Sequence, residues 1–245
     1  MRSQGGPRGP PYVEMDRAVQ WRIVEPMTQV TQLTERGAAT RARIVEAAAD
    51  LVLARGVGAT SLDDIRAGTA TSKSQLFHYF PGGKSDLVGA IAAFQAERVL
   101  EAQRPFLDTL DTWDAWEGWR RAVVAHYSSQ PSWGCPIGAL ASELIASDPD
   151  RAAEVAAHMD RWRSHLEAGL TRMRAAGRLD ADADPRALSL AVFASLQGGL
   201  LLAQAMQSAQ PLEAALDAAL TALRAAATEP RRPARSRTRR PSRGR

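Results

Sequence analysis

Two helix-start signals lie close together near the front of the chain. The first is Ser61-Leu62-Asp63-Asp64, in which an acid follows a capping serine by three residues. The second is Ser72-Lys73-Ser74-Gln75, a capping box with serine at the cap and glutamine three residues later. A break at Gly68 to Thr71 separates them. The pattern therefore predicts two short helices joined by a tight turn.

A longer helix precedes this pair, from about Thr40 to Ala54, and Gly56 and Gly58 end it. Its apolar residues recur at helical spacing and form one stripe, and the two short helices also have apolar positions that can turn inward. These inward positions are Ile44, Ala48, Leu51, Val52, Leu62, Ile65, Leu76 and Phe80. Three helices with a tight break between the second and third are typical of a helix-turn-helix reader. Such a reader inserts the N-terminal residues of its last helix into the major groove of DNA.

The rest of the chain predicts longer helices and contains no convincing alternating strand. They are expected at about 85–104, 112–128, 137–146, 150–176, 184–207 and 211–227. The expected fold is all-α, with an N-terminal three-helix helix-turn-helix domain followed by a larger helical body.

Composition divides the chain into four parts. Residues 1–36 are rich in Gly and Pro and predict a disordered arm, in which Met15 and Met27 are alternative starts. Residues 37–97 form the expected DNA-binding domain, with its motif at 61–80, and residues 98–228 the helical body. Residues 229–245 form an Arg-rich tail that cannot bury a core.

Charge is distributed unevenly. The net charge is +4 overall, but it is +2 over residues 37–84, −6 over 85–228 and +7 over 229–245. Contact with DNA is therefore expected from the front of the chain or from the tail, and not from the acidic body.

The one cysteine, Cys135, cannot form an intramolecular disulfide, and the N-terminus lacks the apolar stretch of a signal peptide. Both features favour a cytoplasmic protein. Residues 187–212 carry no charge, but their polar positions and Gly198-Gly199 favour a buried helix over a membrane span.

The segment "TRARIVEAAADLVLARGVGATSLDDIRAGTATSKSQLFHYFPGGKSDL" resembles the DNA-binding domain of the tetracycline-repressor (TetR) family. "SKSQLFHYFPGGKSDL" and "GCPIGALASEL" are similar to the LmrA/YxaF-like branch of that family. The resemblance implies a homodimeric transcriptional regulator, expected to be a repressor, in which the larger helical body is the ligand-binding and dimerisation domain. It would bind a palindromic double-stranded DNA operator and be released from it by a small molecule of unknown identity. No cofactor and no membrane partner are expected.

The resemblance also implies which residues contact DNA. Departures from the family pattern are Arg66 and Ala70, where the family has Ala and Gly, and Phe77, where it has Tyr; Tyr79 could replace that contact. A glutamine can pair bidentately with adenine, and a lysine can reach guanine or a phosphate. The expected DNA-binding residues are Thr40, Arg41, Ser61, Ser72, Lys73, Ser74, Gln75, Phe77, His78, Tyr79 and Lys84.

The body supplies candidate ligand and dimer residues. Three tryptophans at spacing three, Trp113, Trp116 and Trp119, either line a pocket or pack in the core. The candidate ligand-binding residues are Phe94, Trp113, Trp116, Tyr127, Cys135, His158 and Trp162. A four-helix seam between two copies is expected to include Leu196, Leu200, Leu216 and Leu220.

Catalysis is not indicated. Gly56-x-Gly58 lacks a third glycine and follows a helix, and there is no G-x-S-x-G elbow or paired zinc motif. Glu154, His158 and His165 share a helical face but have no further strong ligand nearby, so no metal is expected.

Two alternatives to a transcriptional regulator stay open. One is a helical enzyme for a small apolar substrate, and the other is a non-specific nucleoid protein that relies on its basic tail.

Overall fold

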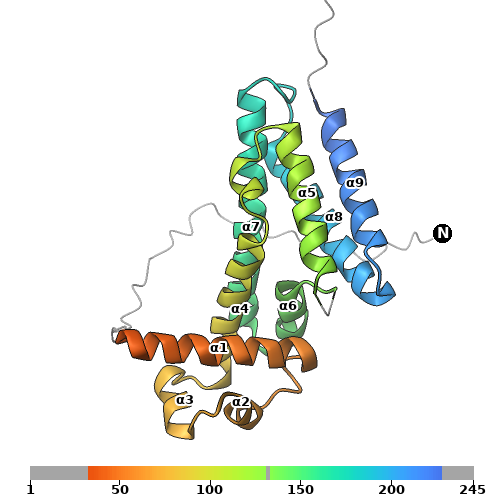
Figure 1. Ribbon diagram of the computed structural model, residues 1–245. Helices are drawn as coiled ribbons and strands as arrows, with labels where there is room; N and C mark the ends of the chain where they lie inside the picture. Colours follow the sequence, from red (N-terminus) through yellow and green to blue (C-terminus); the bar gives the residue numbers. More distant parts are fainter. Residues whose placement is uncertain (1–32, 131–132, 228–245) are drawn as a thin grey trace, which may run out of the picture.

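The computed structural model describes residues 33–130 and 133–227 (Figure 1). In these residues all regular secondary structure is helical apart from a single isolated bridge between Leu179 and Ala227, so the expected all-α class is confirmed. Most of the N-terminal arm and the whole Arg-rich tail of the sequence analysis lie outside the described residues. We call residues 33–83 the head and residues 102–227 the body.

Three helices form the head: α1 (Glu35–Arg55), α2 (Leu62–Thr69) and α3 (Lys73–Tyr79). Helix α1 begins earlier than the expected start near Thr40, because Thr34 caps it by accepting a hydrogen bond from Gly37 N–H at 3.2 Å. The expected end of the arm at residue 36 is therefore wrong. The extra turn is exposed, so no apolar stripe in the sequence indicated it.

Both predicted capping boxes are present. Ser61 Oγ accepts from Asp64 N–H at 3.1 Å, and the Asp64 carboxylate accepts from Ser61 N–H at 2.8 Å. Ser72 Oγ accepts from Gln75 N–H at 3.1 Å, and Gln75 Oε1 accepts from Ser72 N–H at 3.2 Å. Each box satisfies two backbone donors at a helix start, which fixes where α2 and α3 begin.

The turn between α2 and α3 is held from two sides. Ala70 has φ 49° and ψ 40°, the left-handed conformation that glycine adopts more readily. Arg43 on α1 donates from Nη1 to the Thr69 carbonyl at 2.5 Å, and Thr69 Oγ1 donates to the Ile65 carbonyl. The head therefore contains a helix-turn-helix whose turn is fixed by its own first helix.

Helix α4 (Lys84–Glu101) connects the head to the body and packs against α1, α6 (Pro136–Ser147) and α7 (Pro149–Ala175). In Figure 1 it rises from the plane of α1 into the body. The expected boundary at residue 97 falls inside this helix, and its buried side chains lie against both parts. Arg151 on α7 contacts Asp86 at 3.1 Å and donates from Nε to Ser85 Oγ at 2.9 Å, which ties the start of α4 to the body.

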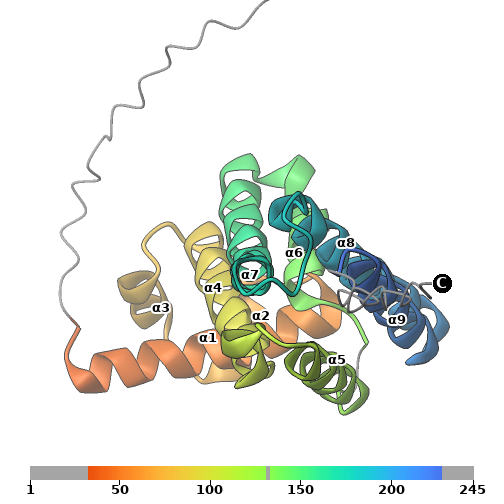
Figure 2. The same cartoon turned by 90° about the horizontal axis from the view of Figure 1, so that it is seen from above.

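The body is a bundle that stands on the head (Figures 1 and 2). The expected helices agree with the observed ones to within three residues, while a short 3₁₀ turn at Phe106–Thr109 was not predicted. The helices are α5 (Trp113–Ser128), α6 (Pro136–Ser147), α7 (Pro149–Ala175), α8 (Pro185–Met206) and α9 (Gln210–Ala225).

Tryptophans fill the centre of the body. Gln103 accepts indole N–H bonds from Trp119 at 2.7 Å and from Trp162 at 3.0 Å, and Trp116 Nε1 lies 3.0 Å from Met173 Sδ. All three rings are fully buried and their donors have partners. We therefore correct the ligand assignment of Trp116 and Trp162: both are core residues.

Helix α8 has a buried side and an exposed apolar side. Leu196 and Leu200 are 0% exposed within one chain, and so is Leu216 on α9, while Leu220 is 4% exposed. Their assignment to the subunit seam is wrong, because a side chain enclosed in its own chain has no surface left for a partner. The exposed large apolar residues of α8 are Leu190, Leu201, Leu202 and Met206, at 54–66%.

Helix α8 is also the one described helix that is long and apolar enough to cross a membrane by length and composition. It packs against α7 and α9 in this fold, and 39% of its most apolar window is buried.

Candidate nucleic-acid interface

The exposed side of α3 carries the polar residues that the sequence predicted for DNA. Leu76 and Phe80 are each 1% exposed and hold α3 against the head core. On the opposite side, Ser72, Lys73, Ser74, Gln75 and His78 are exposed, and Phe77 is 41% exposed. The structure thus brings together six of the eleven predicted residues on the exposed side of one short helix and its cap. Whether each contacts DNA stays a prediction.

The capping box fixes the orientation of the Gln75 amide. Its Oε1 accepts the Ser72 N–H, and Nε2 takes no part in the box. An amide oxygen has two lone pairs, so Oε1 can accept one further hydrogen bond while Nε2 donates. A bidentate pair with adenine therefore stays compatible with an intact box, and so does donation from Nε2 alone to guanine O6 or thymine O4.

The remaining predicted residues have a less direct position. The Arg41 guanidinium lies 5.1 Å from the centre of the Phe80 ring, and Thr40 Oγ1 donates to the Arg36 carbonyl at 2.9 Å. Tyr79 is half-buried against the core, with its ring edge-to-face with His78. Arg41 thus contacts the residue that ends α3, Tyr79 belongs to the partly buried side of α3, and the Thr40 hydroxyl bonds within α1.

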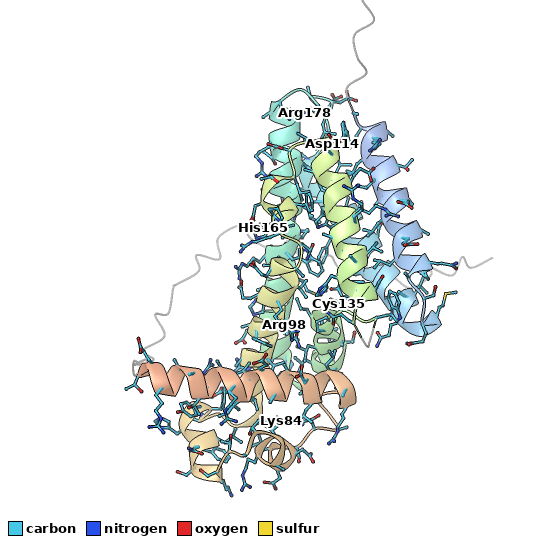
Figure 3. All side chains as sticks on the ribbon, in the orientation of Figure 1. Lys84, Arg98, Asp114, Cys135, His165 and Arg178 are labelled. Atoms are coloured by element: carbon cyan, nitrogen blue, oxygen red, sulfur yellow. The ribbon has the colours of Figure 1, made fainter. Side chains whose placement is uncertain are left out.

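Ser61 and Lys84 belong to other contacts. Ser61 is engaged with Asp64, whose pKa is lowered first by the Ser61 side-chain hydrogen bond and then by the Ser61 backbone hydrogen bond. Lys84, labelled in Figure 3, begins α4 and lines a pocket with Gly58, Glu143 and Asp148. The structure does not bring Lys84 into the α3 group.

Charge on α3 suits a polyanion. The helix carries Lys73 and His78 and no acid, and the nearby carboxylates Asp63 and Asp64 are occupied by Arg66 and Ser61. Arg43, which fixes the turn, was missed by sequence reasoning, because the contact between α1 and the Thr69 carbonyl depends on how the two helices pack.

Comparison with known proteins agrees with this geometry. Residues 44–91 match the model of "Bacterial regulatory proteins, tetR family", and residues 115–219 match "Tetracyclin repressor-like, C-terminal domain". An uncharacterised HTH-type transcriptional regulator of Mycobacterium tuberculosis H37Rv is 33% identical over 188 residues, covering 71% of this chain and 88% of the relative. The chain belongs to the TetR family.

Other TetR-family relatives cover a similar share of the chain. The HTH-type transcriptional regulator LmrA of Bacillus subtilis is 29% identical over 179 residues, 71% of this chain and 90% of LmrA. A TetR transcriptional regulator from Chloroflexus aurantiacus is 27% identical with a TM-score of 0.68, covering 79% of this chain and 98% of that one. The protein is therefore a DNA-binding transcriptional regulator and not an enzyme.

The remaining residues predicted to bind the effector are spread over the interior and the surface of this TetR-family protein. Trp113 lies beneath the Arg224 guanidinium at 5.4 Å, and Phe94 lies near Arg98 at 5.5 Å. His158 is half-buried. None of the seven candidates lines any of the four pockets described between the helices. Contact with a ligand stays a prediction for Phe94, Trp113, Tyr127, Cys135 and His158.

Cys135 caps α6 from a buried position. Its Sγ accepts from Gly138 N–H at 3.4 Å, and burial raises the pKa of the thiol. Burial also raises the pKa of Tyr127, whose hydroxyl lies beside the thiol without a well-formed hydrogen bond. A thiol with a raised pKa is a poor nucleophile at neutral pH, so this cysteine has the properties of a structural cap.

Proposed function

We propose that this TetR-family regulator is a cytoplasmic, homodimeric repressor that binds a palindromic operator and is released by a small molecule. The observation that carries the proposal is the pairing of one DNA-reading head with one exposed apolar helix face in the same chain. Each head presents a single α3, and a second copy would supply the second reader.

The exposed face of α8 fits a second copy. Along one side of this helix every residue is exposed, small or aliphatic, and uncharged. The outer α8 stripe consists of Ala187, Leu190, Ala191, Ala194, Gly198, Leu201, Leu202 and Ala205. A Cβ added at Gly198 would meet nothing within 4 Å, so the stripe leaves room for close approach of another helix. Exposed apolar stripes of this kind are typical of subunit interfaces.

A two-fold pair of identical chains reads DNA with two-fold symmetry. Each α3 contacts one half-site, so the operator should be an inverted repeat whose half-sites lie one helical turn or a multiple of it apart. A small molecule releases such a dimer if it binds more tightly to a conformer in which the spacing of the two α3 helices no longer fits.

The test is selection of bound fragments from the source genome by the purified full chain. An inverted repeat in the selected fragments, and repression of the adjacent promoter in an in vitro transcription assay, are the expected results. Equal affinity for selected and random DNA would instead support a non-specific nucleoid protein. Activation of the adjacent promoter would be compatible with a TetR-family regulator but would contradict the assignment as a repressor.

A further inference from the structure

A pocket lies where the head meets the body, between α1, α4 and α6. Its volume is about 170 Å³, and its walls are mainly aliphatic, with Val52 and Leu53 from α1, Ile91 from α4 and Leu140 from α6. A second pocket of about 440 Å³ shares Leu53, Gln95 and Pro136 with it and extends towards Arg98 and His126. In Figure 3 Arg98 of α4 and Cys135 at the start of α6 lie just above α1. We call the two pockets together the junction pocket.

Gln95 marks the centre of the junction pocket. Its side chain is 4% exposed, and it lines both parts of the cavity. The buried side-chain atoms that lack a hydrogen-bond partner in the described part of the chain do not include the Gln95 amide, so its polar atoms are accessible from the cavity. The amide can therefore offer both a donor and an acceptor to a molecule in the pocket.

Glu143 connects the junction pocket to the head. It belongs to α6, and its Oε2 accepts a hydrogen bond from Gly58 N–H at 3.1 Å in the loop between α1 and α2. A Cβ at Gly56, where φ is 83°, would lie 3.1 Å from both carboxylate oxygens. The carboxylate therefore sits directly against this loop, and it also forms part of the pocket wall.

The loop that Glu143 contacts positions the helix-turn-helix. Thr60 is fully buried and donates from Oγ1 to the Gly56 carbonyl at 2.8 Å, and the next residue, Ser61, caps α2. Displacement of Gly58 would thus be transmitted to the start of α2 and then across the short turn to α3. A body residue that holds Gly58 can set the orientation of the reading helix.

The charges around the cavity select the ligand. Glu143 is the one charged residue among those lining the part next to α6, and no described basic side chain forms an ion pair with it. In the adjoining part, the charges of Asp50 and Arg98 offset each other. Burial is the main cause of the lowered pKa of His126 and the positive charge of Arg98 is the second, so its imidazole is neutral at pH 7. On the outer side of Glu143, Lys84 and Asp148 line a separate pocket. The junction pocket is therefore net acidic.

We propose that the junction pocket binds a compact, largely apolar molecule that carries a protonated amine, and that this amine takes the Glu143 carboxylate away from Gly58. Gln95 accepts or donates a hydrogen bond at the centre of the same ligand. Binding then frees the loop between α1 and α2 and lowers DNA affinity. This inference rests on the proposed function, because it assigns the effector class and the route by which the effector acts.

The binding test uses three probes with the same aromatic body: 2-phenylethylammonium, 2-phenylethanol and phenylacetate. Calorimetry on the full chain should show the ammonium binding most tightly, by about tenfold or more over phenylacetate. Glu143→Gln should remove that preference while leaving 2-phenylethanol affinity within about twofold. Glu213→Gln, which changes a carboxylate on α9 away from the pocket, is the matched control and should leave all three affinities unchanged. Gln95→Leu should weaken both the ammonium and the alcohol.

Amide hydrogen exchange at Gly58 tests the route to the head. Exchange should accelerate both in Glu143→Ala and in the wild-type chain saturated with 2-phenylethylammonium, and the ammonium should weaken binding to the selected DNA fragment. The inference is overturned if no probe binds, if phenylacetate binds as well as the ammonium, or if Gly58 exchange stays unchanged. Ammonium binding at Glu143 without any change in DNA affinity also overturns it.

The two proposals fail in different ways. A wild-type chain that does not prefer the selected fragment over random DNA, with no probe present, contradicts the proposed function. A chain that prefers the fragment but behaves identically with and without the probes contradicts only the junction-pocket assignment.

Discussion

At the scale of single residues, Gln75 performs two tasks that a substitution can separate. Gln75→Glu keeps an acceptor for the Ser72 N–H, so α3 should remain capped and the melting temperature should stay within about 2 °C. The change removes the Nε2 donor and places a negative charge beside the DNA, so affinity for the selected fragment should fall by about tenfold or more. Gel-shift titration and thermal unfolding measure the two effects.

Gln75→Ala serves as the comparison. It should lose the capping contact as well as about 1–3 kcal/mol of discrimination at one base position, measured by competition with single-base variants. Unchanged base preference in both variants would contradict the assignment of α3 as the reading helix.

Cys135 should be chemically protected in the folded chain. Because burial raises the pKa of its thiol, little thiolate is present near pH 7.5, and the side chain is only 7% exposed. Iodoacetamide should therefore modify the native protein much more slowly than the protein in denaturant, as followed by mass spectrometry. Equal rates in both conditions would show that the thiol is accessible and reactive.

At the scale of elements, the turn between α2 and α3 contains removable strain. Ala70→Gly should stabilise the head by about 0.5–1 kcal/mol, because glycine adopts the left-handed conformation at little cost. Ala67→Gly is the matched control: this alanine is exposed within α2, so the same change should destabilise the protein by about 1 kcal/mol. Denaturant unfolding of the two variants measures both signs, and a loss of stability in Ala70→Gly would contradict the argument.

The start of α7 should weaken in acid. Asp148 caps this helix and accepts a hydrogen bond from Ser85 at 2.8 Å; the Ser85 bond is the main cause of its lowered pKa, followed by the Arg151 backbone N–H. A lowered folded pKa gives stability that is fully present above the unfolded value of about 3.9 and is lost as pH falls through the folded value. Asp148→Asn does not titrate. The difference in unfolding free energy between wild type and this variant should be constant above about pH 5 and shrink below pH 4.

The sequence located most of these elements because their ends carry local signals. Serine caps, the glycines after α1 and the prolines at the starts of α8 and α9 depend on neighbouring residues alone, so the boundaries could be predicted. Which side of α8 is buried could not be predicted. That helix is apolar almost all round, and a periodic pattern does not tell whether Leu200 or Leu201 faces the interior. The junction pocket was likewise beyond the sequence, since Gln95, Glu143 and Gly58 meet only through the packing of α1, α4 and α6.

At the scale of the whole molecule, neighbouring leucines on α8 distinguish assembly from folding. Leu201→Glu alters a side chain that is 66% exposed, so the chain should fold but sediment as a monomer and lose most of its DNA affinity at low concentration. Leu200→Glu places a charge in the core and should cost about 4 kcal/mol or more of stability. Analytical ultracentrifugation and thermal unfolding separate the two outcomes. A Leu201→Glu chain that sediments as a tight dimer would reject the outer α8 stripe as the seam.

The absence of charge along the outer α8 stripe has a consequence for a cell that makes several related regulators. Selective pairing of subunits commonly relies on like charges that repel the wrong partner, and the stripe contains none. Subunits would then be sorted by shape alone, and a paralogue with a similar arrangement of Ala, Gly and Leu could form a mixed dimer with this chain. Such a dimer would match one half-site of each operator and neither complete palindrome. Excess of one regulator would then draw the subunits of the other into mixed dimers, and the other regulator would no longer respond to its own effector.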